Sequence, residues 1–300
     1  MKIVAFYYTQ TGQALEILHS VCRPLTEAGH EVVYKTIVPE TPFPFPWTYD
    51  SFFQAFPESR QGIACAVKRM ELDEVADAGL VIIAYQTWFL SPSLPVQGFF
   101  RDEAVRTFLR GKYVVTIDGC RNMWVMSHIK ILENIEQCGG VLTGNIVLQD
   151  RHPNLVSVIP IVRWLIGGKK EKSSIFPAAG VSQKDIDGAA VFGKQIARTL
   201  ADDDLPNLQE KLMHNGAIKY KPDIVFIEKI GHRLFGVWSK FILRKGGYGA
   251  PQRAFRLKLF KYYLFVVLYL ISPVGLLAFY LTYPFRYRAI GKDRLKQCFM

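Results

Sequence analysis

The chain is poor in cysteine and lacks the spacing that cysteines show in small stapled or metal-bound domains. Its five cysteines are odd in number, and no two form a C-x-x-C pair. This pattern argues against a disulfide framework and against a structural zinc site, and it favours a reducing compartment. The histidines also lack metal-ligand spacing, so the sequence predicts no bound metal.

Two common phosphate-binding motifs are also missing, and the start of the sequence does not resemble a secretory leader peptide. The sequence contains no G-x-G-x-x-G after its first apolar run and no G-x-x-x-x-G-K-[ST], which disfavours a Rossmann dinucleotide site and a Walker loop. The apolar run after Lys2 is short and ends in Thr-Gln-Thr-Gly rather than at a small-residue cleavage site. We therefore expect no secretory signal and a protein that starts in the cytoplasm.

Acidic residues are scarce in the last third of the chain. The net charge is +11, but from Lys211 to Met300 there are 17 Lys or Arg against three acids, a charge of +14, which leaves −3 on the first 210 residues. A nucleic-acid-binding domain is not expected to divide its charge in this way, so we predict no nucleic-acid partner. The charge predicts an acidic body with a basic tail.

Apolar runs of strand length alternate with helical patterns through most of the chain. Continuous runs at residues 2–8, 31–38, 78–85, 112–118 and 141–150 are typical of strands buried on both faces. Helices are predicted at 14–25, 95–109, 124–138 and 182–200. The pattern predicts an α/β fold with a doubly wound, five-stranded parallel sheet over residues 1–205, followed by a helical extension at 206–300.

Two segments exceed what this fold requires. They are residues 39–62, which alternate Pro and Phe near their start, and residues 151–179. Both are candidates for lids or docking surfaces.

The turn after the first strand is suited to bind a phosphate. A helix N-terminus at the carboxyl edge of a parallel sheet favours an anion, because its free amides and its dipole point there. Thr9 and Thr11 would add hydroxyl donors, Gly12 would permit close backbone approach, and the N–H groups of Gln10, Gln13 and Ala14 would complete the cradle. The alternative is that Thr11 only caps the helix.

The motif T-x-T-G-x-A resembles the FMN phosphate loop of the flavodoxin family. This resemblance covers about residues 2–200 and implies strand order 2-1-3-4-5 and FMN as cofactor. Where flavodoxins usually have Thr, this chain has Ala14, which removes one hydroxyl contact.

The resemblance also implies that the flavin ring lies between the loops after the third and fourth strands. The first loop holds Thr87, with Trp88 or Phe89 as an aromatic cover. In the second, Gly119 permits close approach, Asn122 could bond the pyrimidine edge, and Trp124 could stack. The alternative for Trp88 and Trp124 is a purely core role.

Three residues are candidates for chemistry. A cation at Arg121 near the flavin N1 would stabilise an anionic reduced flavin, unless Arg121 pairs with Asp118 or a surface acid. Cys120 is the one thiol in a predicted site loop, either a nucleophile or a small residue needed near the ring. His152 could donate a proton to substrate, or stabilise the turn before Pro153.

A longer set of segments, including PFPFPWTYDSFF, AYQTWFLSPSLP, RNMW and DRHPNL, is similar to bacterial proteins labelled dialkylresorcinol condensing enzymes. The resemblance implies a role in aromatic lipid or pigment synthesis. A thiolase-type ketosynthase needs a longer, duplicated fold, so the label alone does not establish condensation. A condensing or cyclising enzyme and a non-catalytic membrane adaptor stay as alternatives.

The tail carries signs of a membrane surface. Residues 262–285 contain no charge and are long enough to cross a bilayer, but basic residues flank both sides, so the positive-inside rule gives no orientation. A re-entrant hairpin, an in-plane helix and a single span are all compatible with this pattern, and a buried oligomer interface is the alternative.

Taken together, the sequence predicts an FMN-dependent oxidoreductase at the cytoplasmic face of a membrane. Its expected partners are a hydrophobic small-molecule substrate, membrane lipid and NAD(P)H as electron donor. A homodimer is a further expectation.

Overall fold

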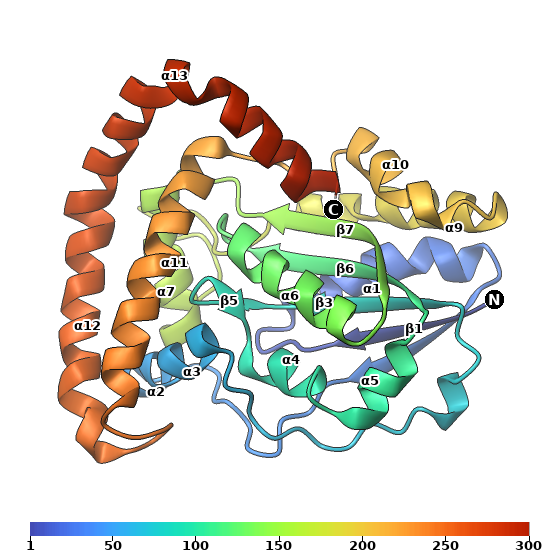
Figure 1. Cartoon of the computed structure of the whole chain (residues 1–300), viewed down its shortest axis with the longest axis horizontal. Coiled ribbons are helices and arrows are strands. Elements are labelled where there is room, and N and C mark those ends of the chain that lie inside the picture. The colour runs from blue at the N-terminus through green and yellow to red at the C-terminus, as the bar shows by residue number, and fades with distance from the viewer. Residues whose placement is uncertain (300) are drawn as a thin grey trace.

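The main sheet has five parallel strands in the order β2–β1–β3–β6–β7 (Figure 1). The computed structural model of the protein describes residues 1–299 and the side chains of residues 1–298. The strands are β1 Lys2–Tyr7, β2 Glu31–Thr36, β3 Leu80–Tyr85, β6 Tyr113–Cys120 and β7 Val141–Gln149. This confirms the predicted doubly wound α/β sheet, because all four strand pairs are parallel and β1 lies between β2 and β3.

Both faces of the sheet are covered, as the continuous apolar strands predict. Alternate residues of β1 enter two cores: Ile3 and Ala5 pack with α1 (Gln13–Glu27) and α9 (Ala190–Ala201), whereas Val4 and Phe6 pack on the opposite face. The second face is covered by α4 Leu94–Phe99, α5 Glu103–Leu109 and α6 Val125–Gln137.

Two predicted helices are each interrupted once. Residues 95–109 form α4 and α5, because Asp102 lies between them and its side chain accepts hydrogen bonds from the N–H groups of Ala104 and Val105. Residues 182–200 form α8 (Gln183–Gly188) and α9, and Ser182 caps α8 by accepting from the N–H of Asp185. Both interruptions lie outside the cavity described below.

The two extra segments form helices beside the carboxyl edge of the sheet. Residues 39–62 contain α2 (Tyr49–Gln54) and α3 (Phe56–Gln61), and residues 151–179 contain α7 (Asn154–Gly167). Between them lies a two-stranded hairpin, β4 Thr87–Trp88 and β5 Ser91–Pro92.

The C-terminal extension is helical and begins near residue 205, at a short turn, Leu205–Asn207. It comprises α10 Leu208–His214, α11 Pro222–Leu243, α12 Ala254–Val266, a π turn at Val267–Ile271 and α13 Ser272–Phe299. Pro273 lies two residues after the end of the π turn. Because proline lacks an N–H and its ring crowds the carbonyl four residues earlier, it accounts for the local widening of the helix.

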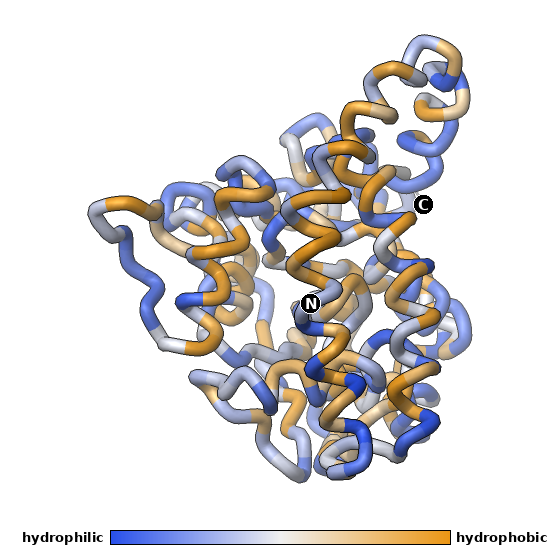
Figure 2. Tube along the Cα trace, turned by 90° about the vertical axis from the view of Figure 1, so that its left-hand side faces the viewer, coloured by the Kyte–Doolittle hydropathy of each residue, from blue (hydrophilic) through white to orange (hydrophobic). Residues whose placement is uncertain are grey.

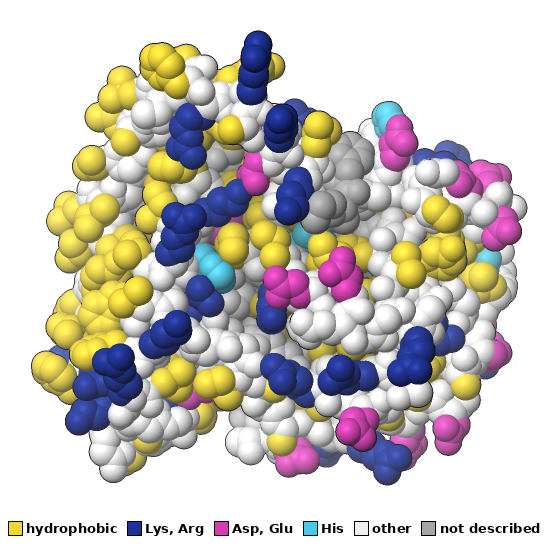
Figure 3. All heavy atoms as spheres, in the orientation of Figure 1, with side chains coloured by type: hydrophobic (Ala, Val, Ile, Leu, Met, Phe, Trp, Pro, Cys, Tyr) yellow, Lys and Arg dark blue, Asp and Glu magenta, His cyan; other side chains and the backbone are white. Residues whose placement is uncertain are grey.

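The helix Pro251–Cys298 is the one helix in the described residues that is long and apolar enough to cross a membrane. Only 11% of its most apolar window is buried, so it is not a core helix. Figure 2 views the molecule from the side on which α12 lies, and hydrophobic stretches run along the helices there. In Figure 3, hydrophobic side chains gather over the edge formed by α12, and Lys and Arg lie beside them.

Both ends of this long helix are fixed to the rest of the protein. At its start, the buried guanidinium of Arg253 forms a two-pronged ion pair with Glu58 of α3, at 2.5 and 2.9 Å. At its end, Asp293 accepts from Lys229 of α11 at 2.6 Å, and Gln209 of α10 donates to the Cys298 carbonyl at 2.7 Å. The helix therefore leaves the domain at α3 and returns beside β7 (Figure 1).

Candidate functional site

A cavity of about 210 Å³ lies where β1, β3 and β6 end. In open parallel sheets, this edge at the point where strand order reverses is the usual place for a ligand. Its lining combines the turn after β1, the loops after β3 and β6, and both extra segments. The lining residues are Gln10, Thr11, Gln13, Ala14, Trp47, Phe52, Ala55, Gln86, Thr87, Trp88, Phe89, Gly119, Cys120, Arg121, Ile161, Trp164, Leu165 and Gly180.

The turn after β1 leaves its donors free, as a phosphate cradle requires. The N-cap of α1 is Gly12, whose φ of 85° is left-handed, and no side chain caps the helix. Thr11 therefore does not cap α1, and the alternative considered for it is wrong. Thr9 Oγ1 is buried and has no hydrogen-bond partner within residues 1–299.

The side chains of two glutamines of this turn bind neighbouring segments, Gln10 the first extra segment and Gln13 the chain just after the second. The Gln10 side chain donates to the Pro44 carbonyl at 2.8 Å and accepts from the indole of Trp47 at 2.9 Å. The buried Gln13 amide donates to the Val181 carbonyl and accepts from the Val181 N–H. Their side chains are thus occupied, and only their backbone N–H groups can serve a ligand.

One cation near the turn comes from a segment that no sequence pattern places there. Lys170 of the Gly-Gly-Lys-Lys stretch lies 3.8 Å from the Glu16 carboxylate in the first turn of α1 and 5.3 Å from the ring of Trp164. The charge of Glu16 opposes an anion at this turn, and Lys170 offsets it.

The loop after β3 forms an aromatic wall. Trp88 packs edge-on against Trp47, Phe43 and Tyr8 at centroid distances of 5.2 to 5.9 Å. Phe89 and Leu90 have φ values of 48° and 62°, a region that costs about 1–3 kcal/mol for such residues and that concentrates at functional sites. With this backbone conformation, the Phe89 side chain forms part of the cavity wall.

The carboxyl end of β6 brings backbone and a thiol to the cavity. A Cβ at Gly119 would lie 2.6 Å from Ile17 Cδ1, so a larger residue at this position would require the Ile17 side chain to shift. Cys120 lines the cavity, and burial together with the nearby Asp118 raises the pKa of its thiol well above the usual range. A thiolate nucleophile is therefore disfavoured here.

Arg121 lies in the cavity wall and is held by neutral groups. Its guanidinium donates to the Asn154 carbonyl at 2.7 Å, to the Asn154 side-chain oxygen at 2.5 Å and to Ser157 Oγ at 3.3 Å. Within the described residues it takes part in no ion pair, so the predicted pairing with Asp118 is wrong. Desolvation lowers its pKa to about 10, and it stays charged at neutral pH with no carboxylate in contact.

Two predicted residues of the turn, Thr9 and Gly12, are not among the lining residues, and three further predicted site residues lie away from the cavity. Trp124 is 1% exposed and packs with Val125, Ile218 and Cys298, so it cannot stack on a ring in the cleft. Asn122 is also buried and donates to the side-chain oxygen of Asn154 at 2.8 Å instead of facing the cavity.

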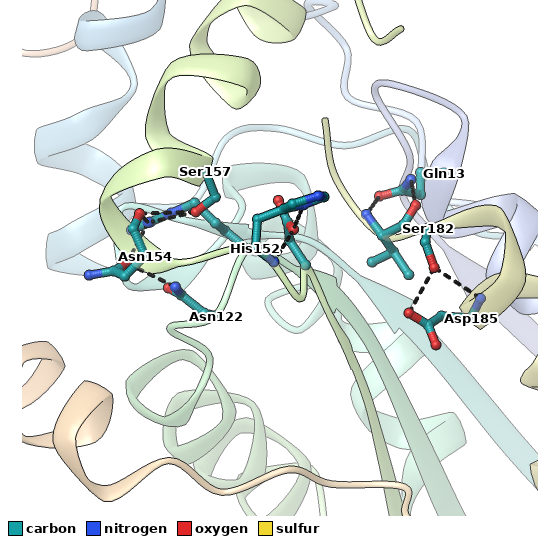
Figure 4. Close-up of polar contacts among 10 residues, drawn as sticks. Gln13, Asn122, His152, Asn154, Ser157, Ser182 and Asp185 are labelled. Atoms are coloured by element: carbon teal, nitrogen blue, oxygen red, sulfur yellow. Dashed lines mark hydrogen bonds and ion pairs between the residues drawn. The ribbon is translucent and has the colours of Figure 1, made fainter. Parts of the chain in front are cut away.

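The third is His152, which is a turn residue. Its Nδ1 lies 2.6 Å from the Asp150 carboxylate, and its backbone N–H donates to the same oxygen. In Figure 4 it lies between the Asn122–Asn154 group and the Gln13 group. His152 is not among the residues that line the cavity, and its contacts with Asp150 are those expected of a turn-stabilising residue; its part in catalysis stays a prediction.

Two buried carboxyls lie behind the cavity wall. Asp118 accepts from Thr87 Oγ1 at 2.8 Å, and burial raises its pKa to about 7. Glu228 of α11 accepts from the N–H of Met126 in the first turn of α6, and burial raises its pKa to about 8. Glu228 joins the C-terminal extension to the parallel-sheet domain at a position that no local sequence pattern indicates.

Several lining residues could not be assigned from the sequence. Trp47 and Phe52 come from the first extra segment, and Ile161, Trp164 and Leu165 come from α7. The sequence showed that residues 39–62 and 151–179 are apolar insertions. It could not show which face of each insertion packs against the sheet. Within residues 1–299 no group of three His, Cys, Asp or Glu residues is arranged to hold a metal ion.

The strand order and the parallel register of the sheet identify the architecture. The fold is flavodoxin-like. No family model matches this sequence, and no curated protein matches it. Among solved structures, the chain is similar to a flavodoxin from the domain Archaea (14% identity, 67% of this chain and 99% of that one, TM-score 0.40).

Two further solved structures show the same level of similarity. A flavodoxin of Streptococcus pneumoniae TIGR4 has 12% identity over 68% of this chain and 99% of its own, with a TM-score of 0.37. A flavoprotein in complex with FMN from Lactobacillus acidophilus NCFM has 13% identity over 49% and 92%, with a TM-score of 0.40. At these values the flavodoxin-like assignment depends on topology and not on the matches.

Proposed function

We propose that this flavodoxin-like protein binds FMN in the cavity at the end of β1, β3 and β6 and acts as an oxidoreductase on a hydrophobic substrate. The observation that carries the proposal is the juxtaposition of an uncapped α1 N-terminus, an aromatic wall and an unpaired arginine around one cavity. Bound FMN would supply electron and hydride transfer.

The residues of the cavity suit the parts of FMN. The free N–H groups of the turn, the hydroxyls of Thr9 and Thr11 and the left-handed Gly12 would hold the phosphate. Trp88, Trp47 and Trp164 would enclose the ring, and Gly119 would contribute backbone to the cavity wall. Arg121 would stabilise negative charge on a reduced ring, which favours two-electron chemistry with NAD(P)H as donor.

The membrane surface is the proposed place of action. Because both ends of the helix Pro251–Cys298 are fixed to the same domain, a single crossing would separate groups that are bonded here. We therefore favour an in-plane or re-entrant arrangement at the cytoplasmic face over a single span. Cations close to anionic headgroups contribute about 1 kcal/mol each.

The resemblance to dialkylresorcinol proteins suggests an aromatic lipid as the substrate. Condensation through Cys120 is the less favoured alternative, because burial keeps its thiol protonated. A non-catalytic adaptor would have no need of the strained Phe89 loop beside the cavity. A homodimer stays a prediction.

The test is FMN uptake by the purified full chain, followed by flavin absorbance. We expect Gly12→Val to lower FMN affinity at least tenfold, because a side chain at φ 85° distorts the cradle. Gly29→Val is the matched control: it has nearly the same φ, 83°, at the other end of α1, and it should retain FMN. A colourless wild-type protein that takes up no FMN would contradict the proposal.

A further inference from the structure

A second cavity, of about 280 Å³, adjoins the first on the side of the C-terminal extension. The two share Phe52, Thr87, Phe89, Cys120 and Arg121 in their walls. Because five residues from three loops line both, they form neighbouring compartments of one site, divided by the strained Phe89 loop.

The second cavity is apolar away from this shared wall. Its sides come from α7, α11 and the long helix, with Val158, Val162 and Ile166 on α7 and Ile227, Gly231 and Phe235 on α11. Gly231 keeps the space open, since a Cβ there would lie 3.3 Å from Leu90 Cδ1. Such a lining excludes a polar substrate, because polar groups buried there would lack partners.

The outer wall of this cavity is the π turn and its neighbours. Val267, Leu268 and Tyr269 line it, together with Ser272 at the start of α13. Leu270 and Ile271, in the same turn, are 67% and 53% exposed. The cavity therefore lies directly behind the surface that we propose faces lipid.

The cavity also reaches the molecular surface. Phe265 and Tyr49 line it, yet 54% of Phe265 and 47% of Tyr49 are exposed. Its opening is thus at the apolar edge of the molecule, whereas its inner end is at Thr87, Cys120 and Arg121. A molecule lying along it would have an apolar end near lipid and a polar end beside the first cavity.

We propose that this cavity binds the hydrocarbon chain of a single-chain amphiphile that enters from the bilayer, with its oxygen-bearing head at Arg121. No described carboxylate is in ion-pair contact with Arg121, and the hydrogen bonds it makes in the described residues all use one guanidinium nitrogen, so the others can bond a head-group oxygen. Binding of the hydrocarbon chain does not depend on FMN. Only the statement that the head group then lies beside the flavin rests on the proposed function.

The experiment uses hexadecanoic acid with a photoreactive diazirine at mid-chain, added to the full-length protein in phosphatidylcholine vesicles. Labelled residues are located by mass spectrometry. We expect labelling of Phe235 and Ile227 inside the cavity in addition to the exposed Leu270. Labelling confined to Leu270 and other exposed residues would overturn the proposal.

The variant that tests the cavity is Val162→Trp, which fills it from α7. Its matched control is Ile159→Trp, on the same helix but outside the lining and 37% exposed. Val162→Trp should lower interior labelling at least tenfold and leave Leu270 labelling unchanged, and Ile159→Trp should change neither. Equal interior labelling in both variants would contradict the inference.

A second variant and a second measurement separate the possible failures. If Val162→Trp does not fold, Gly231→Leu fills the same space from α11 and should give the same loss. FMN uptake is measured on the same samples: chain labelling without FMN uptake removes the proposed function but keeps this cavity, whereas FMN uptake without interior labelling removes only the cavity.

Discussion

At the scale of single residues, the most unusual group is the Glu228 carboxyl. It is fully buried, one oxygen accepts from the Met126 N–H, and the other has no partner in the described part of the chain. Its pKa, raised to about 8 by burial, means that the folded state holds a proton that the unfolded state releases near pH 4. The contribution of Glu228 to folding stability is therefore expected to fall as pH rises from about 4 to about 8.

We predict that Glu228→Gln flattens this pH dependence. The amide oxygen can still accept from Met126, and no charge has to be buried above pH 8. At pH 9 the variant should be more stable than wild type by about 1–3 kcal/mol, with little difference at pH 4. Urea unfolding across this pH range measures it.

Glu103→Gln, at an exposed position in the first turn of α5, is the control and should change stability by less than about 0.5 kcal/mol. Parallel pH curves for wild type and Glu228→Gln would show that the carboxyl is ionised in the folded protein. The raised pKa assigned to Asp118, which also rests on burial, would then have to be dropped as well.

At the scale of elements, the sequence predicted the sheet well because each strand carries its own signal. A run such as Leu80–Tyr85 is apolar throughout, and all six residues are buried. The α1 helix was equally predictable, since Ile17, Leu18 and Val21 recur with helical spacing and lie in one core. Local pattern and final packing agree in these elements.

The site was less predictable because long-range contacts decide where side chains point. Trp124 lies in the expected loop, but the extension packs over it and draws it into a core with Cys298. Arg121 lines the cavity as predicted, yet its partners are on α7, which no pattern placed against β6. Spacing along the chain cannot specify which insertion covers which loop.

The contact between α1 and α9 supplies a prediction at this scale. A Cβ at Gly193 would lie 1.9 Å from the Val21 carbonyl oxygen, so the two helices touch through backbone. Gly193→Ala should therefore force the helices apart and cost at least about 1–3 kcal/mol. Chemical denaturation measures this loss.

Gly188→Ala is the matched control, because a Cβ at this position, at the end of α8, would have nothing within 4 Å. It should be neutral, or stabilise by up to about 1 kcal/mol, since alanine restricts the unfolded chain. A Gly193→Ala protein as stable as this control would mean that α9 can shift without loss.

At the scale of the whole molecule, charge and apolar surface are on the same side. Arg256 lies over Phe241 at 4.0 Å, and Arg286 lies over Phe226 at 4.9 Å, so cations border the apolar edge formed by the long helix (Figure 3). Such a border suits a protein resting on anionic lipid, with aromatic and aliphatic side chains below the headgroups.

We predict that Val274→Glu with Leu277→Glu releases the protein from vesicles containing anionic lipid. Val274 is 64% exposed and Leu277 is 61% exposed, so folding should be spared while the apolar edge is interrupted. Flotation with phosphatidylglycerol vesicles should show at least a tenfold loss of binding. Ile175→Glu, 79% exposed but outside the extension, is the control, and its binding should equal wild type.

The two ion pairs at the ends of the long helix, Arg253–Glu58 and Lys229–Asp293, also limit which changes the protein can tolerate during evolution. Because Arg253 and Asp293 are both held in ion pairs, deletion of one residue between them would rotate the rest of the helix by about 100° and break one of the two pairs. Substitutions that keep this stretch hydrophobic leave both ion pairs in place. Substitutions in this region should therefore be tolerated far more readily than insertions or deletions.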